Sequence, residues 1–198
     1  MVNRAQLAFK WLPAVFAAVL LFSPGVQQPI RTVNSNDALL SSIGNTWYYN
    51  GTLFNGEIYA LYNNGDTMLT EKLKNGLLTG IMKRWYPDRQ LHQITMYNKG
   101  MRQGVQYSWW PGGQIKSMYN YKDDRLNGPA KEWYAGGGAY REMNYKMGYE
   151  NGLQRMWNVI GVITANYEMR DGRKYGLTGV RKCENTVDDD PAKLFTKK

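Results

Sequence analysis

Apolar and polar residues alternate along most of the chain between residues 57 and 176, with the period of two that a β-strand requires. In the stretch 105–121, for example, Trp109 projects to one face, while Gln106 and Ser108 project to the other. Pro111 is followed by two glycines, and this composition predicts a turn because glycine accepts positive φ without a steric penalty. The stretch therefore predicts two short antiparallel strands joined by a turn.

This hairpin pattern recurs every 24 residues without insertion or deletion. A glycine marks the recurrence at Gly56, Gly80, Gly104, Gly128, Gly152 and Gly176. We predict an array over residues 47–176 that begins with half a copy at Trp47 and continues with five full copies, at 57–80, 81–104, 105–128, 129–152 and 153–176. The predicted fold class is all-β. It is an elongated antiparallel β-meander of tandem 24-residue β-hairpins, with about eleven strands and a length of about 50 Å.

Aromatic residues recur at fixed positions of the copies and define a candidate partner-binding surface. We predict that the tryptophans form a ladder along one face and that tyrosines of the returning strands accompany it. These residues are Trp85, Trp109, Trp133 and Trp157, with Tyr97, Tyr121 and Tyr145. Lys83, Lys131 and Arg155 share one position of the copies and predict a basic stripe beside the ladder. The alternative interpretation is structural: the aromatics form the hydrophobic layer of a thin sheet, and the basic residues cap its edge.

The two ends of the chain differ from the array. Residues 1–25 combine a basic start with an uncharged, mostly apolar stretch of twelve residues and then small residues, which predicts a signal peptide. We therefore expect an exported protein, periplasmic or secreted, with possible membrane association. Residues 26–46 predict a polar linker, and residues 177–198 predict a short cap followed by a loose tail. Whether residues 1–25 are cleaved or anchor the chain is left open.

Charge and reactive residues narrow the class of function. The formal net charge of +9 favours acidic partners, either anionic membrane surfaces or acidic protein faces. His92 is the only histidine, and it occurs in one copy; Cys183 is the only cysteine, so no intramolecular disulfide can form. The sequence has no zinc-type ligand spacing and no phosphate-binding glycine loop. We predict no enzyme, no cofactor, no metal site, no small-molecule substrate and no nucleic-acid partner.

The copies resemble MORN repeats, and more closely the MORN-variant repeats of bacterial proteins. The shared form is an aromatic pair, a turn glycine, a second aromatic, a basic residue and a glycine-bearing corner, which reads "YNKGMRQG", "YKDDRLNG" and "YKMGYENG" here. The resemblance implies the hairpin array and a role in membrane attachment, lipid contact or protein scaffolding. Bacterial chains with such repeats are also grouped as the YwqK-like antitoxin family of toxin–antitoxin systems.

Three hypotheses of function follow. The first is an exported, non-catalytic scaffold that binds a protein partner through its sheet surface. The second is peripheral binding to an anionic membrane, supported by the basic stripe. The third, implied by the resemblance, is an antitoxin-like inhibitor of a toxin. The sequence leaves open the partner, the exposed face of the sheet, the role of Cys183 and the oligomeric state.

Overall fold

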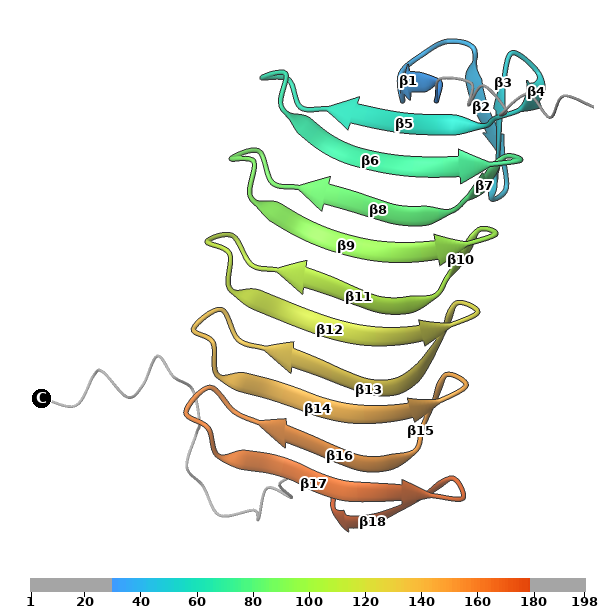
Figure 1. Cartoon of the computed structure of the whole chain (residues 1–198). Helices are drawn as coiled ribbons and strands as arrows, with labels where there is room; N and C mark the ends of the chain where they lie inside the picture. The colour runs from blue at the N-terminus through green and yellow to red at the C-terminus, as the bar shows by residue number, and fades with distance from the viewer. Residues whose placement is uncertain (1–29, 179–198) are drawn as a thin grey trace, which may run out of the picture.

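The computed structural model describes residues 30–178, and these residues form a single-layer β-ribbon of stacked hairpins (Figure 1). The long sheet has 15 strands and is not closed into a barrel. The strands of the hairpins are β5 (Gly56–Leu61), β6 (Thr67–Lys74), β8 (Gly80–Trp85), β9 (Leu91–Asn98), β11 (Gly104–Trp109), β12 (Ile115–Lys122), β13 (Arg125–Trp133), β14 (Ala139–Lys146), β16 (Gly152–Trp157) and β17 (Ile163–Arg170). The remaining strands are β1 (Thr32–Asn34), β2 (Leu40–Ile43), β3 (Thr46–Tyr49), β4 (Thr52–Leu53), β7 (Leu77–Leu78), β10 (Met101–Arg102), β15 (Tyr149–Glu150) and β18 (Arg173–Leu177).

The predicted fold class is confirmed. Neighbouring hairpin strands pair antiparallel in sequence order, from β5 and β6 to β16 and β17, so the chain runs as a meander. Every hairpin has a register shift at the same place, just before the residue that is Trp85 in β8 and Trp109 in β11. The turns within hairpins lie along one long edge, which we call the turn edge, and the connections between hairpins lie along the other, the corner edge (Figure 1).

The corner edge is built from tight turns in which two successive residues have positive φ. Asn75 and Gly76 have φ of 51° and 74°, and the equivalent residues of the other corners are similar. Two positive φ values are the requirement of a type I′ turn, whose twist matches that of the flanking strands. Asp124 takes the glycine position in one corner, with φ of 63°. It accepts hydrogen bonds from the backbone N–H and Nε of Arg102 at 3.0 and 2.8 Å, which ties this corner to the preceding one.

The prediction of a polar linker over residues 26–46 is wrong where the structure describes it. β1 pairs in parallel with β5, and β2 pairs with β3 in a separate three-stranded sheet with β4. Trp47 lies in β3, so the predicted leading half copy does not extend the long sheet either. The physical reason is burial: Val33 and Phe54, with 5% and 2% exposed, pack on the first hairpin and cover its end.

The C-terminal end of the array is different. β18 pairs with β17, and all five of its residues are exposed. The predicted signal peptide at 1–25 lies outside the described residues, and so does the predicted tail except for Leu177 and Thr178.

Candidate functional site: a polar hollow in the inner face

The two faces of the sheet are not equivalent. Residues that lie directly opposite each other in antiparallel strands project to the same face. Ser108 lies opposite Ser117, and both are buried, whereas Tyr107 and Met118 lie opposite each other on the other side and are more exposed. We call the face of Ser108 and Ser117 the inner face and that of Tyr107 the outer face. The buried residues of the five hairpins gather on the inner face.

One row of the inner face crosses the whole array, and its middle is polar. Strand pairing places ten residues side by side, in the order Ala60, Leu69, Arg84, Gln93, Ser108, Ser117, Glu132, Arg141, Met156 and Ala165. The two residues at each end of the row are apolar, and the six in the middle form hydrogen bonds or carry charge. A sheet that needed only an apolar layer would not require this change in the middle.

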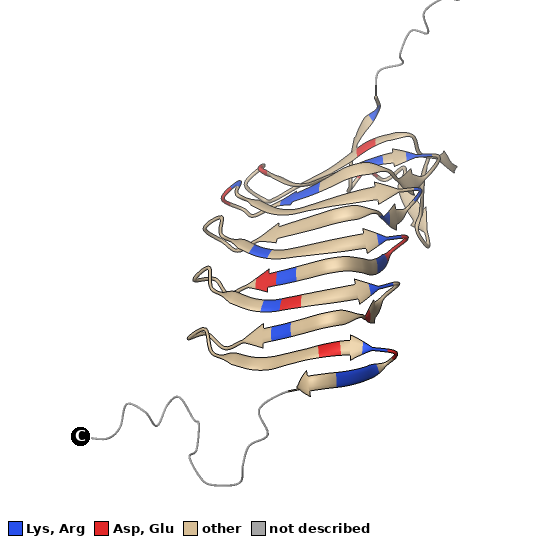
Figure 2. Cartoon of the chain, turned by 60° about the horizontal axis from the view of Figure 1, so that its bottom comes forward, with Lys and Arg blue, Asp and Glu red and all other residues tan. Residues whose placement is uncertain are grey.

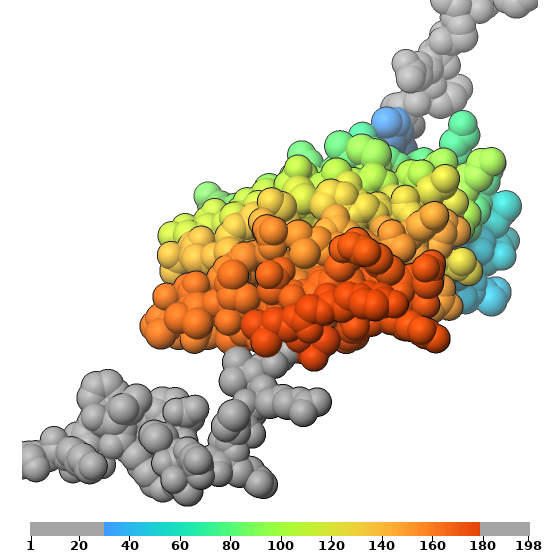
Figure 3. Space-filling model, turned by 90° about the horizontal axis from the view of Figure 1, so that it is seen from below, coloured from blue at the N-terminus to red at the C-terminus, as the bar shows by residue number. Residues whose placement is uncertain are grey.

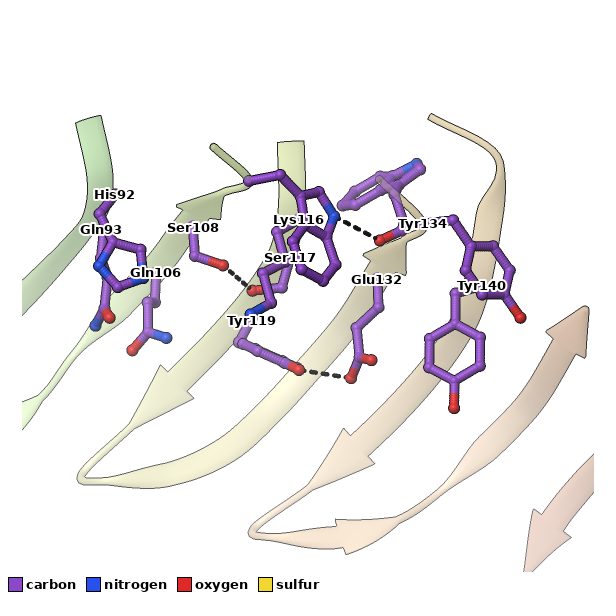
Figure 4. A pocket seen from close by; sticks show the side chains of 12 residues that line it. His92, Gln93, Gln106, Ser108, Lys116, Ser117, Tyr119, Glu132, Tyr134 and Tyr140 are labelled. Atoms are coloured by element: carbon purple, nitrogen blue, oxygen red, sulfur yellow. Dashed lines mark hydrogen bonds between the residues drawn. The ribbon is translucent and has the colours of Figure 1, made fainter. Parts of the chain in front are cut away.

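A hollow of about 460 Å³ opens over this polar segment (Figure 4). At its floor the hydroxyl groups of Ser108 and Ser117 are 2.6 Å apart. The Tyr119 hydroxyl donates to Glu132 Oε1 at 2.5 Å, and Arg141 Nη2 donates to Glu132 Oε2 at 2.8 Å. Glu132 is therefore held between a phenol and a guanidinium.

The ionisable groups around Glu132 keep their protons. Burial raises the pKa of Tyr119, and the hydrogen bond to Glu132 raises it further. Burial lowers the pKa of Arg141, but the contact with Glu132 outweighs burial, so that the pKa is raised. Neither side chain gives up a proton near neutral pH, so the floor acts as a fixed set of hydrogen-bonding groups.

Aromatic side chains form the wall of the hollow toward the turn edge. Trp110 and Tyr134 line the hollow, and each donates to a main-chain carbonyl of the next copy: Trp110 Nε1 to that of Trp133 at 3.1 Å, and the Tyr134 hydroxyl to that of Trp157 at 2.9 Å. Tyr86 lies outside the lining and donates in the same way to the carbonyl of Trp109 at 2.8 Å. Tyr62 makes the same bond to Trp85 at 2.8 Å. We call these four residues, Tyr62, Tyr86, Trp110 and Tyr134, the aromatic ladder.

A second side chain from the returning strand rests on most rings of this ladder. His92 lies on Tyr86 with 4.4 Å between ring centroids, and Tyr140 lies on Tyr134 with 4.9 Å. Lys116 Nζ lies 4.4 Å from the centroid of Trp110, a cation–π geometry. Burial, followed by the charges of Lys116 and Arg84, lowers the pKa of His92. His92 is thus part of the wall, beside two cations.

The predicted aromatic surface is divided between the two faces. Trp109 contacts Tyr107 on the outer face, with ring centroids 6.1 Å apart, and the strand alternation places Trp85, Trp133 and Trp157 there as well. Tyr97, Tyr121 and Tyr145 lie on the inner face, because they are directly opposite Gly80, Gly104 and Gly128. The prediction that these tyrosines accompany the tryptophans is therefore wrong. The glycines lack a side chain, which leaves room for a ring across from each.

The predicted basic stripe lies on the outer face. Strand pairing links Lys83 through Tyr107 to Lys131 and Arg155 in one row. Glu142 lies between the last two and contacts both, at 3.0 Å from Lys131 and 3.8 Å from Arg155. One carboxylate therefore offsets part of the charge of the three basic residues.

Sequence reasoning missed the hollow, although a signal was present. Gln106, Ser108 and Glu132 occupy strand positions that hold Ile58, Ala60 and Met156 in other copies. These polar residues of the middle copies mark the polar segment of the inner row. They could be recognised only once it was known which residues face inward. Within residues 30–178, no group of three or more potential metal-ligating side chains occurs together. The same residues contain no helix that is long and apolar enough to span a membrane.

No protein-family model matches the chain, and no curated protein is similar to it in sequence. The resemblance to MORN-variant repeats therefore stays a prediction, and the function has to be argued from the geometry of the sheet.

Proposed function

We propose that this chain is an exported, non-catalytic binding protein that holds another protein against the inner face of its sheet. The observation that carries the proposal is the polar segment of the inner row beneath an open hollow of about 460 Å³. Buried polar groups are retained in proteins where they are hydrogen-bonded and give specificity. An apolar surface interrupted by a few fixed polar groups is typical of recognition sites.

The shape of the row favours a polypeptide over a small molecule. The row extends over ten strands, which is about 43 Å at 4.8 Å per strand. The row has apolar ends and a polar centre, so it offers contacts along its whole length. An extended or helical segment of a partner protein could use all of these contacts. The amide nitrogen of Gln106 and the ammonium of Lys116 have no hydrogen-bond partner among residues 30–178, so both remain free to donate.

A pair of adjacent residues tests this proposal. A photoreactive amino acid is placed at Gln106, on the inner face, or at Tyr107, on the outer face, and the producing cells are irradiated. We expect a specific protein adduct from position 106 and none from position 107. Tyr107 is 36% exposed, so a lack of adduct there does not reflect a lack of access. Adducts from position 107 alone, or from neither position, would refute recognition by the inner face.

Export is tested separately. We expect mass spectrometry of the protein from producing cells to find it outside the cytoplasm, with the first 25 residues or so removed. An intact N-terminus on cytoplasmic protein would remove export from the proposal and leave the binding face unaffected.

A second candidate function, peripheral binding to an anionic membrane, is favoured by the corner edge. Basic residues recur there once per copy, at or beside the end of each returning strand, and they are exposed. They are Lys74, Lys99, Lys122 and Lys146 in the first four copies and Arg170 in the fifth. Figure 2 shows basic and acidic residues at this edge, with further charged residues along the strands. Met147 and Tyr149 are 42% and 78% exposed beside them. Lysines with exposed apolar and aromatic side chains are typical of surfaces that contact lipid headgroups.

Vesicle sedimentation tests this second function. We expect binding to phosphatidylserine vesicles that weakens with salt, and little binding to phosphatidylcholine vesicles. The variant Lys74→Gln/Lys122→Gln/Lys146→Gln should lose most of the binding. The matched control, Lys83→Gln/Lys131→Gln/Arg155→Gln, removes the same number of charges from the outer face and should bind nearly normally. Equal losses in both variants would show that net charge alone is responsible.

A further inference from the structure

The two ends of the array are finished in different ways. At the N-terminal end, β1 adds to the sheet, and β2, β3 and β4 form a small sheet whose residues pack with Phe54 and Ile58. At the C-terminal end, which Figure 3 shows, β18 is the last strand of the described residues, and no described strand pairs with its outer edge. β18 lies opposite residues 166–170, so the first three residues of β17, 163–165, have no strand on that side among the described residues. Repeat arrays need a cap at each end, because an end copy exposes the surface that inner copies bury.

The last turn has an unusual composition for its position. In the first four copies the four turn residues are polar or small, at 63–66, 87–90, 111–114 and 135–138. In the fifth copy they include Val159, Ile160 and Val162, which are 77%, 79% and 54% exposed. Ile163, which follows, is 42% exposed. Three β-branched aliphatic residues at the tip of a solvent-exposed turn favour aggregation unless another segment or molecule covers them.

The aromatic ladder stops at this copy. Asn158 stands where the preceding copies have an aromatic residue. Its Oδ1 accepts hydrogen bonds from the N–H groups of Ile160 and Val162 at 3.2 and 2.9 Å. The side chain therefore fixes the apolar turn instead of reaching toward a next copy, and the surface at this end is a defined one.

We infer that residues 179–198 of this chain are the occupant of this surface and cap the C-terminal end by packing on the turn at 159–162. The end of β18 lies close to this turn. Leu177 lies opposite Asn166 in the antiparallel pair, so the chain after Thr178 leaves the sheet about three residues from Ile163. The segment has twenty residues, which can span up to about 66 Å when extended, far more than the distance to the turn requires.

The composition of the segment matches the surface. It carries the apolar residues Val180, Leu194 and Phe195 and an acidic block at 188–190. The edge that it would cover presents Arg173 and Lys174, both exposed. The acidic block is opposite in charge to these two residues. The whole segment carries five basic and four acidic residues, and Lys174 already lies 3.8 Å from Glu150, so the apolar residues rather than the net charge carry the match.

Hydrogen exchange on the full chain tests the inference. The turn at 159–162 is changed to the Pro-Gly-Gly-Gln found at 111–114, by the substitutions V159P, I160G and V162Q. This turn already serves another copy, so the hairpin should keep its fold. We expect amides in 179–198 to be protected in the parent protein and to exchange at least tenfold faster in the variant. The matched control, D88G/R89G, gives the second copy the same turn and should leave exchange in 179–198 unchanged.

Three results would overturn the inference. Amides in 179–198 that exchange at unprotected rates in the parent protein would show that the segment does not dock. Protection that falls on dilution, together with a dimer by light scattering, would assign the surface to a second copy. Protection of residues 158–164 that arises only with lipid vesicles would assign it to a membrane. None of these results concerns the inner face, so the test of the proposed function is independent of this one.

Discussion

Single residues in the turns carry backbone conformations that most side chains avoid. Four of the five turns have glycine at the position of positive φ, with values from 82° to 86°, and the second copy has Arg89 at 68°. A side chain in this region costs about 1 kcal/mol or more. Arg89 also makes an ion pair with Asp66 at 2.7 Å, but the arginine side chain is 79% exposed, so solvent screens the pair.

Arg89→Gly should therefore stabilise the protein by about 0.5–1 kcal/mol, because relief of the strained backbone outweighs a screened ion pair. Urea unfolding at neutral pH measures the change. Asp66→Asn serves as the control, since it removes the same ion pair without a change of backbone conformation, and it should be close to neutral. A loss of stability in Arg89→Gly similar to that in Asp66→Asn would mean that the ion pair matters more than the strain.

Glu71 gives the stability a dependence on pH. It is 7% exposed on the inner face, and burial raises its pKa above the ordinary 4.5, an effect that the charge of Arg84 reduces without reversing. The folded protein thus holds this proton more tightly than the unfolded chain does. Stability from this group is present below pH 4.5 and is lost as pH rises from there through the folded pKa.

Glu71→Gln removes the titration and should unfold at higher urea than the parent protein at pH 7, with a smaller difference at pH 4. The comparison of the two proteins at each pH isolates Glu71 from all other titrating groups. A difference that is the same at both pH values would show that burial of Glu71 does not control its ionisation.

Between elements, the aromatic ladder joins each hairpin to the next by a bond that is independent of the sheet ladder. The Tyr86 hydroxyl to the Trp109 carbonyl is a part-buried bond of 2.8 Å between two copies. Tyr86→Phe should lower the free energy of unfolding by about 1 kcal/mol, because the carbonyl loses its side-chain partner in a part-buried site. Tyr107→Phe on the outer face is the control, since its hydroxyl has no side-chain partner among residues 30–178. Equal effects of the two substitutions in thermal unfolding would argue against the ladder.

The strands and turns could be predicted from the sequence because each is decided locally, by alternation in the strands and by glycine in the corners. The division of the aromatics between the faces could not. Trp85 and Tyr97 lie in the two strands of one hairpin, and the pairing of these strands shifts by one residue beside Trp85. The face on which each ring lies depends on this shift, and no residue type in the sequence marks it. The N-terminal strands were missed because Val33 becomes a core residue only where it meets Phe54 from another element. The hollow depends on residues of five strands, β9, β11, β12, β13 and β14, and needs the register of all of them.

On the scale of the whole molecule, stability comes from contacts between neighbouring copies, since only adjacent strands of the meander pair. Removal of residues 105–128 should therefore leave a folded protein, because Gly104 takes the place of Gly128 and Tyr86 meets the carbonyl of Trp133. We expect one cooperative urea transition with an m value lower by about one-sixth, in proportion to the surface lost. Removal of 105–116 alone is the control, since it leaves a strand without its hairpin partner and should prevent folding.

The longer deletion also removes Gln106, Ser108 and Ser117 from the floor of the hollow. The photoreactive amino acid is then placed at Gln93, on the inner face. We expect the deletion protein to fold but to form no adduct, which would separate the role of the copies in folding from the role of this copy in recognition. An adduct that survives the deletion would place recognition elsewhere on the ribbon.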